Sequence, residues 1–212
     1  METKTARRSS PPSAEWGEEH FENYGGEGRS YRRTWKQFNS VNDCVKIFSR
    51  IEGLRIESVI VLGAAMGDIL KFFESTWGTR PHGCELSRWA YRQIPHPYRR
   101  RIKNQDMKHY VKECRRRVDV VYANSFMYLN EEDVPWVLKH CARIGRYLFV
   151  DLSYSECFAE NDPFRRILKP HRWWRNQFRE AGFVPFGKHR KLWRSASRIQ
   201  ALAALSGRSA KK

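Results

Sequence analysis

The fold of this chain is decided by the stretch Ser58-Val59-Ile60-Val61-Leu62-Gly63-Ala64-Ala65-Met66-Gly67-Asp68-Ile69-Leu70-Lys71-Phe72-Phe73. Its first part, Val59 to Leu62, is apolar and mostly β-branched, which is typical of a buried strand. Small residues bounded by Gly63 and Gly67 follow, and an apolar stripe then predicts a helix. A strand, a tight turn and a helix open the nucleotide-binding α/β sheets, in which a ligand approaches backbone N–H groups at a helix N-terminus. The segment alone fits a buried strand, turn and helix without a ligand equally well.

Further apolar runs alternate with helical patterns along the chain. We expect strands over 82–87, 101–104, 118–124, 147–152, 183–186 and 192–199. We expect helices over 39–48, 68–77, 88–94, 107–114, 130–144 and 170–181. Asn130 and Asp133 resemble a capping box, and Gly145 is placed to end that helix. Pro185 predicts an edge strand or a bulge, because proline cannot donate a ladder hydrogen bond.

Length and composition indicate one globular α/β domain with tails. The chain has 212 residues, of which 41% are hydrophobic and 14% aromatic. No apolar run reaches the roughly 18 to 20 residues of a membrane span, and no apolar segment of a secretory signal is visible. The five cysteines form no C-x-x-C pair, and Cys84 and Cys141 read as core thiols, so we expect a reducing cytoplasm and no metal site.

The net charge of +17 favours an anionic partner, which could be nucleic acid, a phosphorylated substrate or a membrane surface. A basic, fully solvated surface is the competing explanation. Basic stretches at 99–101, 115–117 and 188–194 favour nucleic acid, since phosphate contacts need Lys and Arg but no base-reading residues. No dimerisation signal is evident, so the oligomeric state stays open.

The stretch from Ser58 to Phe73 resembles the first motif of the class I S-adenosylmethionine-dependent methyltransferases, which reads hydrophobic-Leu-Asp-x-Gly-x-Gly-x-Gly. Gly63 stands where Asp is usual, Ala65 replaces the first glycine and Gly67 keeps the second. Ile69 replaces the third glycine. The first motif is therefore degenerate in this chain.

Two later segments also resemble this family. Gly83-Cys84-Glu85-Leu86-Ser87 matches its hydrophobic-Gly-x-Asp/Glu-x-Ser passage, and residues 118–124 resemble its fourth motif. No proline follows Asn124, which separates the chain from the enzymes that methylate amino groups of nucleic acids.

The resemblance implies a Rossmann-like three-layer sandwich in the α/β class. Its sheet would have seven mostly parallel strands and end in a C-terminal antiparallel hairpin. We expect disordered basic tails at 1–14 and 204–212, an N-terminal arm with lid helices at 15–50, and a methyltransferase-like domain at 51–203. Tyr24, Tyr31 or Trp35 of the arm could cover the cofactor, or simply pin the arm to the core.

By the same resemblance, Gly63, Ala65 and Gly67 would border the methionine part of S-adenosylmethionine. Glu85 lies about 20 residues beyond the turn, the spacing at which Rossmann-like folds place a carboxylate on ribose hydroxyls. The alternative for Glu85 is a surface acid near a helix start.

The adenine would be bound by Asp106, at the position of the acidic residue that follows the third strand, and by Met107. The alternative for Asp106 is a helix N-cap, and the two roles are compatible. Asn124 would lie at the rim of the site. Asp68 would supply the acidity lost at Gly63 only if the turn points it inward.

The resemblance implies an S-adenosylmethionine-dependent methyltransferase of unknown substrate, and the charge favours nucleic acid or another anionic molecule as that substrate. No catalytic residue is assigned, since methyl transfer needs little beyond alignment and exclusion of water. The alternative is an inactive methyltransferase-like fold that serves as a basic nucleic-acid-binding or scaffold module, because an alanine at a turn position needing a positive φ would be strained. A nicotinamide-dependent oxidoreductase fits less well, since Gly-x-Gly-x-x-Gly is missing.

Overall fold

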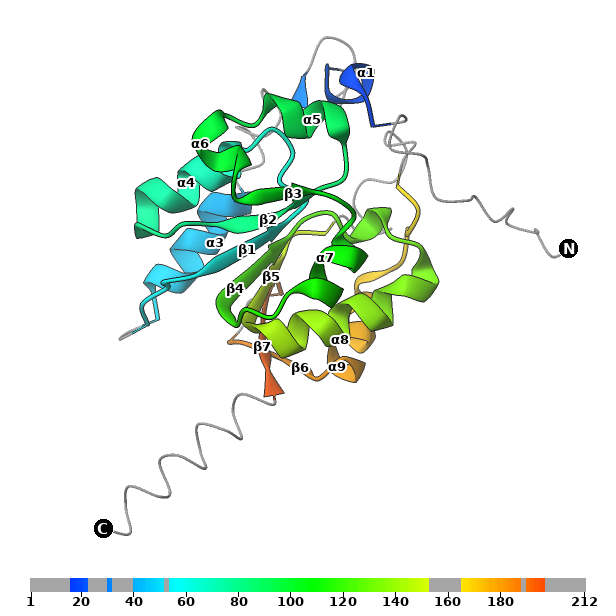
Figure 1. Ribbon diagram of the computed structural model, residues 1–212. Coiled ribbons are helices and arrows are strands. Elements are labelled where there is room, and N and C mark those ends of the chain that lie inside the picture. Colours follow the sequence, from blue (N-terminus) through cyan, green and yellow to red (C-terminus); the bar gives the residue numbers. More distant parts are fainter. Residues whose placement is uncertain are drawn as a thin grey trace, which may run out of the picture.

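A computed structural model of the chain describes residues 16–22, 30–31, 40–51, 54–152, 165–187 and 190–196. These residues form one seven-stranded sheet in the order β3-β2-β1-β4-β5-β7-β6, with helices on both faces (Figure 1). The strands are β1 (Val59–Leu62), β2 (His82–Glu85), β3 (Ile102–Asn104), β4 (Val118–Ala123), β5 (Gly145–Val150), β6 (Phe183–Pro185) and β7 (Leu192–Ser195). The helices are α1 (Glu18–Glu22), α3 (Ser40–Ser49), α4 (Asp68–Trp77), α5 (Arg88–Gln93), α6 (His96–Arg99), α7 (Met107–Glu113), α8 (Val134–Ile144) and α9 (His171–Glu180), with 3-10 turns η2 (Phe126–Tyr128) and η3 (Glu131–Asp133).

Alternate residues of the central strands pack into two separate cores, as the two-residue period of a strand requires. In β1, Ile60 and Leu62 face the core formed with α7, α8 and α9, whereas Val59 and Val61 face the core formed with α3 and α4. All four are buried, which explains why the run is apolar throughout rather than alternating. The result is a sheet between two helical layers, so the predicted three-layer α/β sandwich is confirmed.

The first five strands are mutually parallel, and β7 runs antiparallel to both β5 and β6. Strands β1 to β5 therefore all end at one edge of the sheet, which we call the carboxyl edge, and begin at the opposite amino edge. The predicted C-terminal antiparallel hairpin is confirmed. Pro185 lies in β6 at the edge of the sheet, as its lack of an N–H group predicts.

The predicted capping box at Asn130 and Asp133 is wrong. Asn130 precedes η3 and Asp133 is its last residue, and α8 begins only at Val134, without a hydrogen bond from a side chain to its first N–H groups. The Asn130 amide instead donates to the Asp133 carboxylate at 3.3 Å. The turn is therefore closed by contact between the two side chains.

The strand boundaries also differ from the predictions, by one or two residues at β2, β3, β4 and β6 and in more instructive ways at β5 and β7. The fifth strand was expected at 147–152 but spans Gly145–Val150, because Gly145 ends α8 in an extended conformation that already belongs to the strand. A Cβ on Gly145 would lie 2.6 Å from a methyl group of Val121, so only glycine fits between these strands. The seventh strand ends at Ser195, and residues 197–199 lie outside the described part of the chain.

Among the described residues, no helix is both long and apolar enough to cross a bilayer. The predicted core thiols Cys84 and Cys141 are fully buried, and burial raises the pKa of both well above the usual range of a thiol. Trp174 of α9 is also fully buried, in the core that α9 shares with α7 and α8.

Candidate functional site

The turn after β1 has an unusual backbone conformation. Three of its residues have a positive φ: 82° at Gly63, 47° at Ala65 and 86° at Gly67. A Cβ on Gly63 would lie 2.6 Å from the hydroxyl of Ser125, and one on Gly67 would lie 2.9 Å from the Ile94 side chain. Both glycines are thus required by conformation and by space. Ala65 is the one residue other than glycine with a positive φ in the described part of the chain.

This turn is bonded to the end of the neighbouring strand β2. The N–H groups of Gly63 and Ala64 both donate to the carbonyl of Cys84 at 3.0 Å. The next N–H group, that of Ala65, donates to the carboxylate of Glu85 at 2.6 Å. The last residue of β2 therefore places its charge directly on the turn.

Glu85 is buried, with 7% of its surface exposed, and its second carboxylate oxygen accepts from the N–H of Ser87 at 2.7 Å. Burial raises the pKa of Glu85 to about 7, and the hydrogen bonds from Ser87 and Ala65 oppose that rise. The alternative of a surface acid is therefore wrong for this residue. The backbone N–H of Leu86 also acts on this carboxylate, so three backbone N–H groups stabilise its charged form.

Ser87 links the site to the N-terminal segment. Its hydroxyl accepts from the N–H of Ala90 as the N-cap of α5, and it donates to the carbonyl of Trp16. The Trp16 ring also packs edge-on against Tyr128, with centroids 4.7 Å apart. Ser87 follows β2 and Tyr128 follows β4, and β1 lies between these strands in the sheet. Trp16 therefore crosses the carboxyl edge beside the turn.

Helix α1 extends this cover. Phe21 stacks on Trp89 with centroids 5.4 Å apart and shares a buried cluster with Ala65 and Met66 of the turn. Tyr31, predicted as a lid residue, packs edge-on against Phe21. The other two predicted lid residues, at positions 24 and 35, lie outside the described residues. The roles of Trp16 and Phe21 could not be predicted from the sequence, because their partners are far away in the chain.

Asp106 caps helix α7, as its alternative role predicts: its carboxylate accepts from the N–H of His109 at 3.0 Å. It remains half-exposed just after β3. Met107 follows as the first residue of α7 and packs against the core. Asn104, which the sequence analysis did not select, donates to the carbonyl of Glu85 at 2.8 Å and holds β3 to the end of β2.

Asn124 lies at the end of β4, where its amide donates to the hydroxyl of the buried Tyr122 at 2.7 Å. The neighbouring Ser125 donates to the carbonyl of Leu62 at 2.9 Å, which ties the end of β4 to the turn. Asp68 is the first residue of α4, where a negative charge is favourable.

Asp151 follows β5 and forms an ion pair with Lys191 at 3.0 Å. Lys191 also contacts Asp43 of α3 at 2.9 Å. Burial raises the pKa of Asp151 and the lysine partly offsets this effect. Asp151 is therefore a paired acid at the carboxyl edge.

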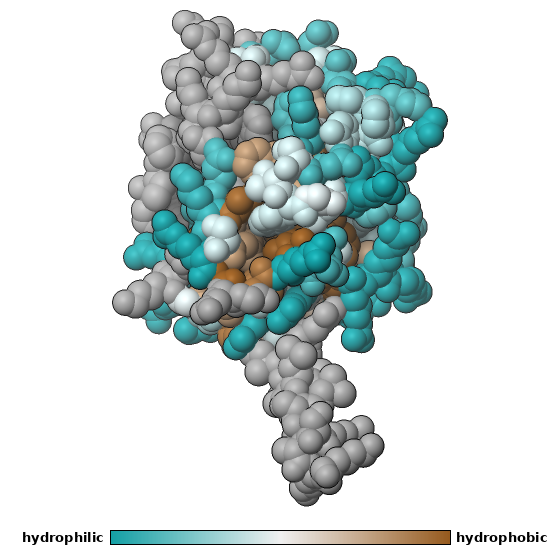
Figure 2. Space-filling view, turned by 90° about the vertical axis from the view of Figure 1, so that its left-hand side faces the viewer, coloured by the Kyte–Doolittle hydropathy of each residue, from teal (hydrophilic) through white to brown (hydrophobic). Residues whose placement is uncertain are grey.

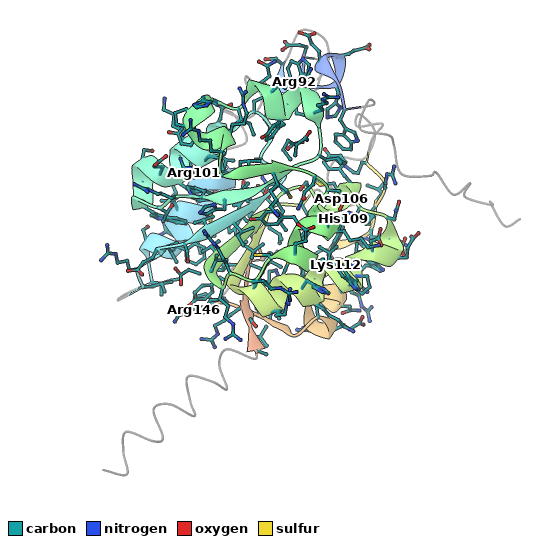
Figure 3. The ribbon with its side chains drawn as sticks, viewed as in Figure 1. Arg92, Arg101, Asp106, His109, Lys112 and Arg146 are labelled. Atoms are coloured by element: carbon teal, nitrogen blue, oxygen red, sulfur yellow. The ribbon has the colours of Figure 1, made fainter. Side chains whose placement is uncertain are left out.

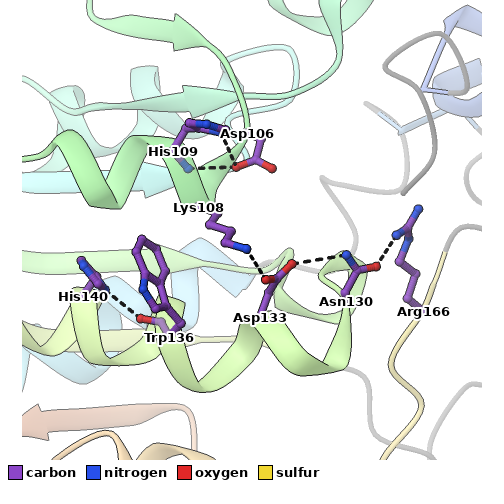
Figure 4. Close-up of polar contacts among 8 residues, drawn as sticks. All are labelled: Asp106, Lys108, His109, Asn130, Asp133, Trp136, His140 and Arg166. Carbon is purple, nitrogen blue, oxygen red and sulfur yellow. Dashed lines mark hydrogen bonds and ion pairs between the residues drawn. The ribbon is translucent and has the colours of Figure 1, made fainter. Parts of the chain in front are cut away.

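A second polar network holds the rim on the other side of the site (Figure 4). Lys108 of α7 contacts Asp133, which is bonded to Asn130, and Asn130 accepts from the guanidinium of Arg166. The backbone N–H groups of residues 166 and 167 both donate to the carbonyl of Met127 at 3.0 Å. These contacts join α7, η3, the segment before α9 and η2 into one rim.

The structure brings most of the predicted site residues to the carboxyl edge. The turn glycines, Ala65 and Glu85 are in direct contact or adjacent, and Asp106, Met107 and Asn124 follow the neighbouring strands β3 and β4. A bare-backbone turn beside a buried carboxylate fits a nucleoside group, since a carboxylate accepts hydrogen bonds from adjacent hydroxyls. Within the described ranges, no three His, Cys, Asp or Glu side chains are grouped as around a metal ion.

Among the comparisons with known proteins, the one with solved structures supports the fold. No protein-family model matches the chain, and a search of curated proteins found no match. Solved structures do match. A sugar N-methyltransferase from Streptoalloteichus aligns with a TM-score of 0.61 and 15% identity over 78% of this chain and 90% of its own.

The magnesium protoporphyrin IX methyltransferase of Synechocystis, solved with bound S-adenosylmethionine, aligns with a TM-score of 0.60 and 13% identity, over 89% of this chain and 96% of its own. A methyltransferase from Archaeoglobus fulgidus aligns with a TM-score of 0.58 and 16% identity, over 70% of this chain and 69% of its own. At these identities the likeness concerns the fold. The chain therefore has the fold of the class I S-adenosylmethionine-dependent methyltransferases, as its motifs predict.

Proposed function

We propose that this chain binds S-adenosylmethionine at the carboxyl edge and transfers its methyl group to an acceptor. The observation that carries the proposal is the buried carboxylate of Glu85, bonded at 2.6 Å to the N–H of Ala65 in the turn after β1. Burying a carboxylate is costly, and its position beside a bare-backbone turn suits a ligand with neighbouring hydroxyl groups.

Different residues of the site would bind different parts of the cofactor. The turn at Gly63, Ala65 and Gly67 would border the methionine part, and the carboxylate of Glu85 would accept hydrogen bonds from the ribose hydroxyls. The adenine would lie beside Asp106 and Met107. Asn124 would lie at the rim, between the cofactor and the acceptor.

When bound, the cofactor supplies a methyl group that its sulfonium has already activated. The chain would then have to orient the acceptor and exclude water, and no nucleophile is needed. Trp16 and Phe21 suit the exclusion of water because they cover the turn with aromatic surface. We propose that the N-terminal arm, 15–50, is the lid that covers the cofactor on a methyltransferase-like domain at 51–203.

The acceptor is proposed to be anionic, with nucleic acid as the leading class, because the chain carries a net charge of +17. The buried free thiols Cys44, Cys84 and Cys141 fit a reducing cytoplasm, which we propose as the location.

A second function is favoured by one observation. Ala65 holds a φ of 47°, which costs an L-residue about 1 kcal/mol, and its methyl group lies on the turn. If that methyl group prevents the approach of the cofactor, the chain is an inactive fold that serves as a basic binding or scaffold module.

Calorimetry with S-adenosylmethionine and S-adenosylhomocysteine separates the two functions. We expect micromolar binding by the natural chain, a large loss in Glu85→Gln and Glu85→Ala, and natural affinity in the control Glu180→Gln, which removes an exposed acid at the end of α9. Absence of binding at millimolar ligand would exclude the enzyme and favour the scaffold. Equal binding by Glu85→Ala and Glu180→Gln would show that the cofactor lies elsewhere.

A further inference from the structure

The amino edge of the sheet, where β1 to β5 begin, carries a row of arginines. The segments that lead into β2, β3 and β4, and the start of β5, each contribute at least one. Figure 3 shows Arg101 and Arg146 on this side of the molecule, away from the carboxyl edge. Basic residues are expected at helix C-termini, which also lie here, so the structural arginines must first be separated from the others.

Three arginines have structural partners. Arg99 donates to two backbone carbonyls at the end of α5, at 2.6 and 3.0 Å, and Arg143 donates to two at the end of α7, at 3.1 and 3.3 Å. Arg101 forms an ion pair with Glu74 at 2.9 Å. The backbone carbonyls at the ends of α5 and α7 and the carboxylate of Glu74 therefore already have arginine partners.

Six further arginines have no acidic partner among the residues that the structure describes. Five are exposed and the sixth, in β5, is half-buried; they are Arg80, Arg100, Arg115, Arg116, Arg117 and Arg146. We call these six the arginine row. Within the described part of the chain, none of the six side chains bonds to the carbonyls of a helix end or to an acid. Arg100 caps α6 through its backbone N–H alone, and the Arg146 guanidinium lies over the Tyr147 ring at 5.2 Å.

The contacts of Arg116 show that this charge is not neutralised locally. Its guanidinium contacts Nε2 of His82 at 3.1 Å, which requires that nitrogen to be an acceptor. Burial, followed by the positive charges of Arg116 and Arg101, lowers the pKa of His82. The nearby acid Asp119 already accepts hydrogen bonds from the N–H groups of residues 57 and 58 and from a serine hydroxyl.

The row follows the order of the strands. It extends from the start of β3 to the start of β5, which is four strand spacings or about 19 Å. This length matches about five to six phosphates of one duplex strand. Strand β7 is antiparallel to β5 and therefore ends at the same edge.

We propose that the arginine row is a surface that binds the phosphate backbone of nucleic acid without reading its sequence. The surface is separated from the candidate cofactor turn by the length of the strands. For the six residues of β4 this is about 20 Å. Nucleic acid bound at the row is therefore anchored to the chain on the side away from the turn. The anchoring does not depend on methyl transfer.

The chemistry of the row favours nucleic acid over a membrane. All six residues are arginines, whose planar guanidinium groups bind phosphate oxygens in pairs. Stable attachment to a membrane surface usually needs apolar insertion as well. Among the described residues the large hydrophobic side chains classed as exposed are Leu86 and Leu168, which follow β2 and precede α9, away from this edge. Figure 2 shows the left-hand side of the view in Figure 1, on which hydrophilic side chains surround a smaller hydrophobic area.

The test is fluorescence anisotropy of the full chain with labelled single-stranded RNA and duplex DNA of mixed sequence, between about 50 and 200 mM salt. We expect the triple variant Arg115→Gln/Arg116→Gln/Arg117→Gln to lose at least about tenfold in affinity at low salt. Its slope of log affinity against log salt should fall by about 2 for single strands. The control Lys71→Gln/Arg92→Gln/Arg172→Gln removes the same charge from exposed positions of α4, α5 and α9, and should bind nearly as the natural chain does.

Equal losses in the triple variant and its control would overturn the proposal, since charge alone would then explain binding. It would also fail if the natural chain does not bind at low salt, or if anionic lipid vesicles bind more tightly with the same dependence on the row. If circular dichroism shows that the triple variant is unfolded, Arg80→Gln/Arg100→Gln tests the other end of the row. Calorimetry with S-adenosylhomocysteine on the same variants reports separately on the cofactor site, which they leave intact.

Discussion

The buried carboxylate of Glu85 should make cofactor binding depend on pH near neutrality. Its pKa is raised to about 7 by burial, so about nine tenths of the molecules hold a neutral carboxyl at pH 6 and about one tenth at pH 8. Only the carboxylate accepts a hydrogen bond from each of two ribose hydroxyls. The affinity for S-adenosylhomocysteine should therefore fall about tenfold, or about 1.4 kcal/mol, from pH 8 to pH 6.

The assay is calorimetric titration at several pH values for the natural chain and for Glu85→Gln. Histidine side chains in general also titrate near neutral pH. They are present in both proteins, so the difference between the two profiles isolates Glu85. The glutamine variant should bind weakly and with little dependence on pH. Parallel profiles would refute the reasoning.

The same group should affect stability with a defined sign. Its pKa rises from 4.5 to about 7 on folding, so the native state holds the proton more tightly than the unfolded state does. The favourable contribution is complete below pH 4.5 and is lost as the pH rises to about 7, by about 3 kcal/mol in total. Urea unfolding of the natural chain should show this loss relative to Glu85→Gln between pH 5 and 8.

Three further substitutions test the turn and its cover. Ala65→Gly should stabilise the chain by up to about 1 kcal/mol in urea unfolding, because it relieves a φ of 47°; a clear loss of stability would contradict the strain. Gly63→Ala should destabilise by about 2 to 3 kcal/mol, since its Cβ would lie 2.6 Å from the Ser125 hydroxyl. Its control Gly78→Ala, with a φ of 66° and no atom within 4 Å, should cost only about 1 kcal/mol, and equal losses would rule out the clash. Trp16→Ala should speed the release of S-adenosylhomocysteine about three- to tenfold in surface plasmon resonance, as loss of an aromatic contact implies; an unchanged rate would remove Trp16 from the lid.

The order and type of the elements could be predicted from the sequence because the central strands are buried on both faces. An apolar run such as Val59 to Leu62 predicts a strand that is buried on both faces, and glycines and prolines mark where such segments end. Boundaries were harder. Gly145 fits a helix end and a strand start equally well in sequence, and the approach of Val121 decides between them.

The candidate site could be predicted only where it is local in sequence. The spacing from the turn to Glu85 is set by one β-α-β unit, so it could be recognised without a structure. The cover could not: the bond from Ser87 to Trp16 joins residues 71 positions apart. No local pattern marks such a contact, because Trp16 looks like any aromatic residue of a terminal arm. The capping box predicted at Asn130 and Asp133 does not form, for a related reason. Both side chains instead bond to residues distant in sequence, Asp133 to Lys108 and Asn130 to Arg166.

The two outer strands of the sheet limit how this chain can assemble. β3 and β6 each have only three residues, and β6 ends in Pro185, which offers no N–H group to a neighbour. A second copy or an extended peptide could form only a very short ladder at either side. Sheet-to-sheet aggregation is thereby discouraged, and stable self-association of the described core would have to use its helical faces.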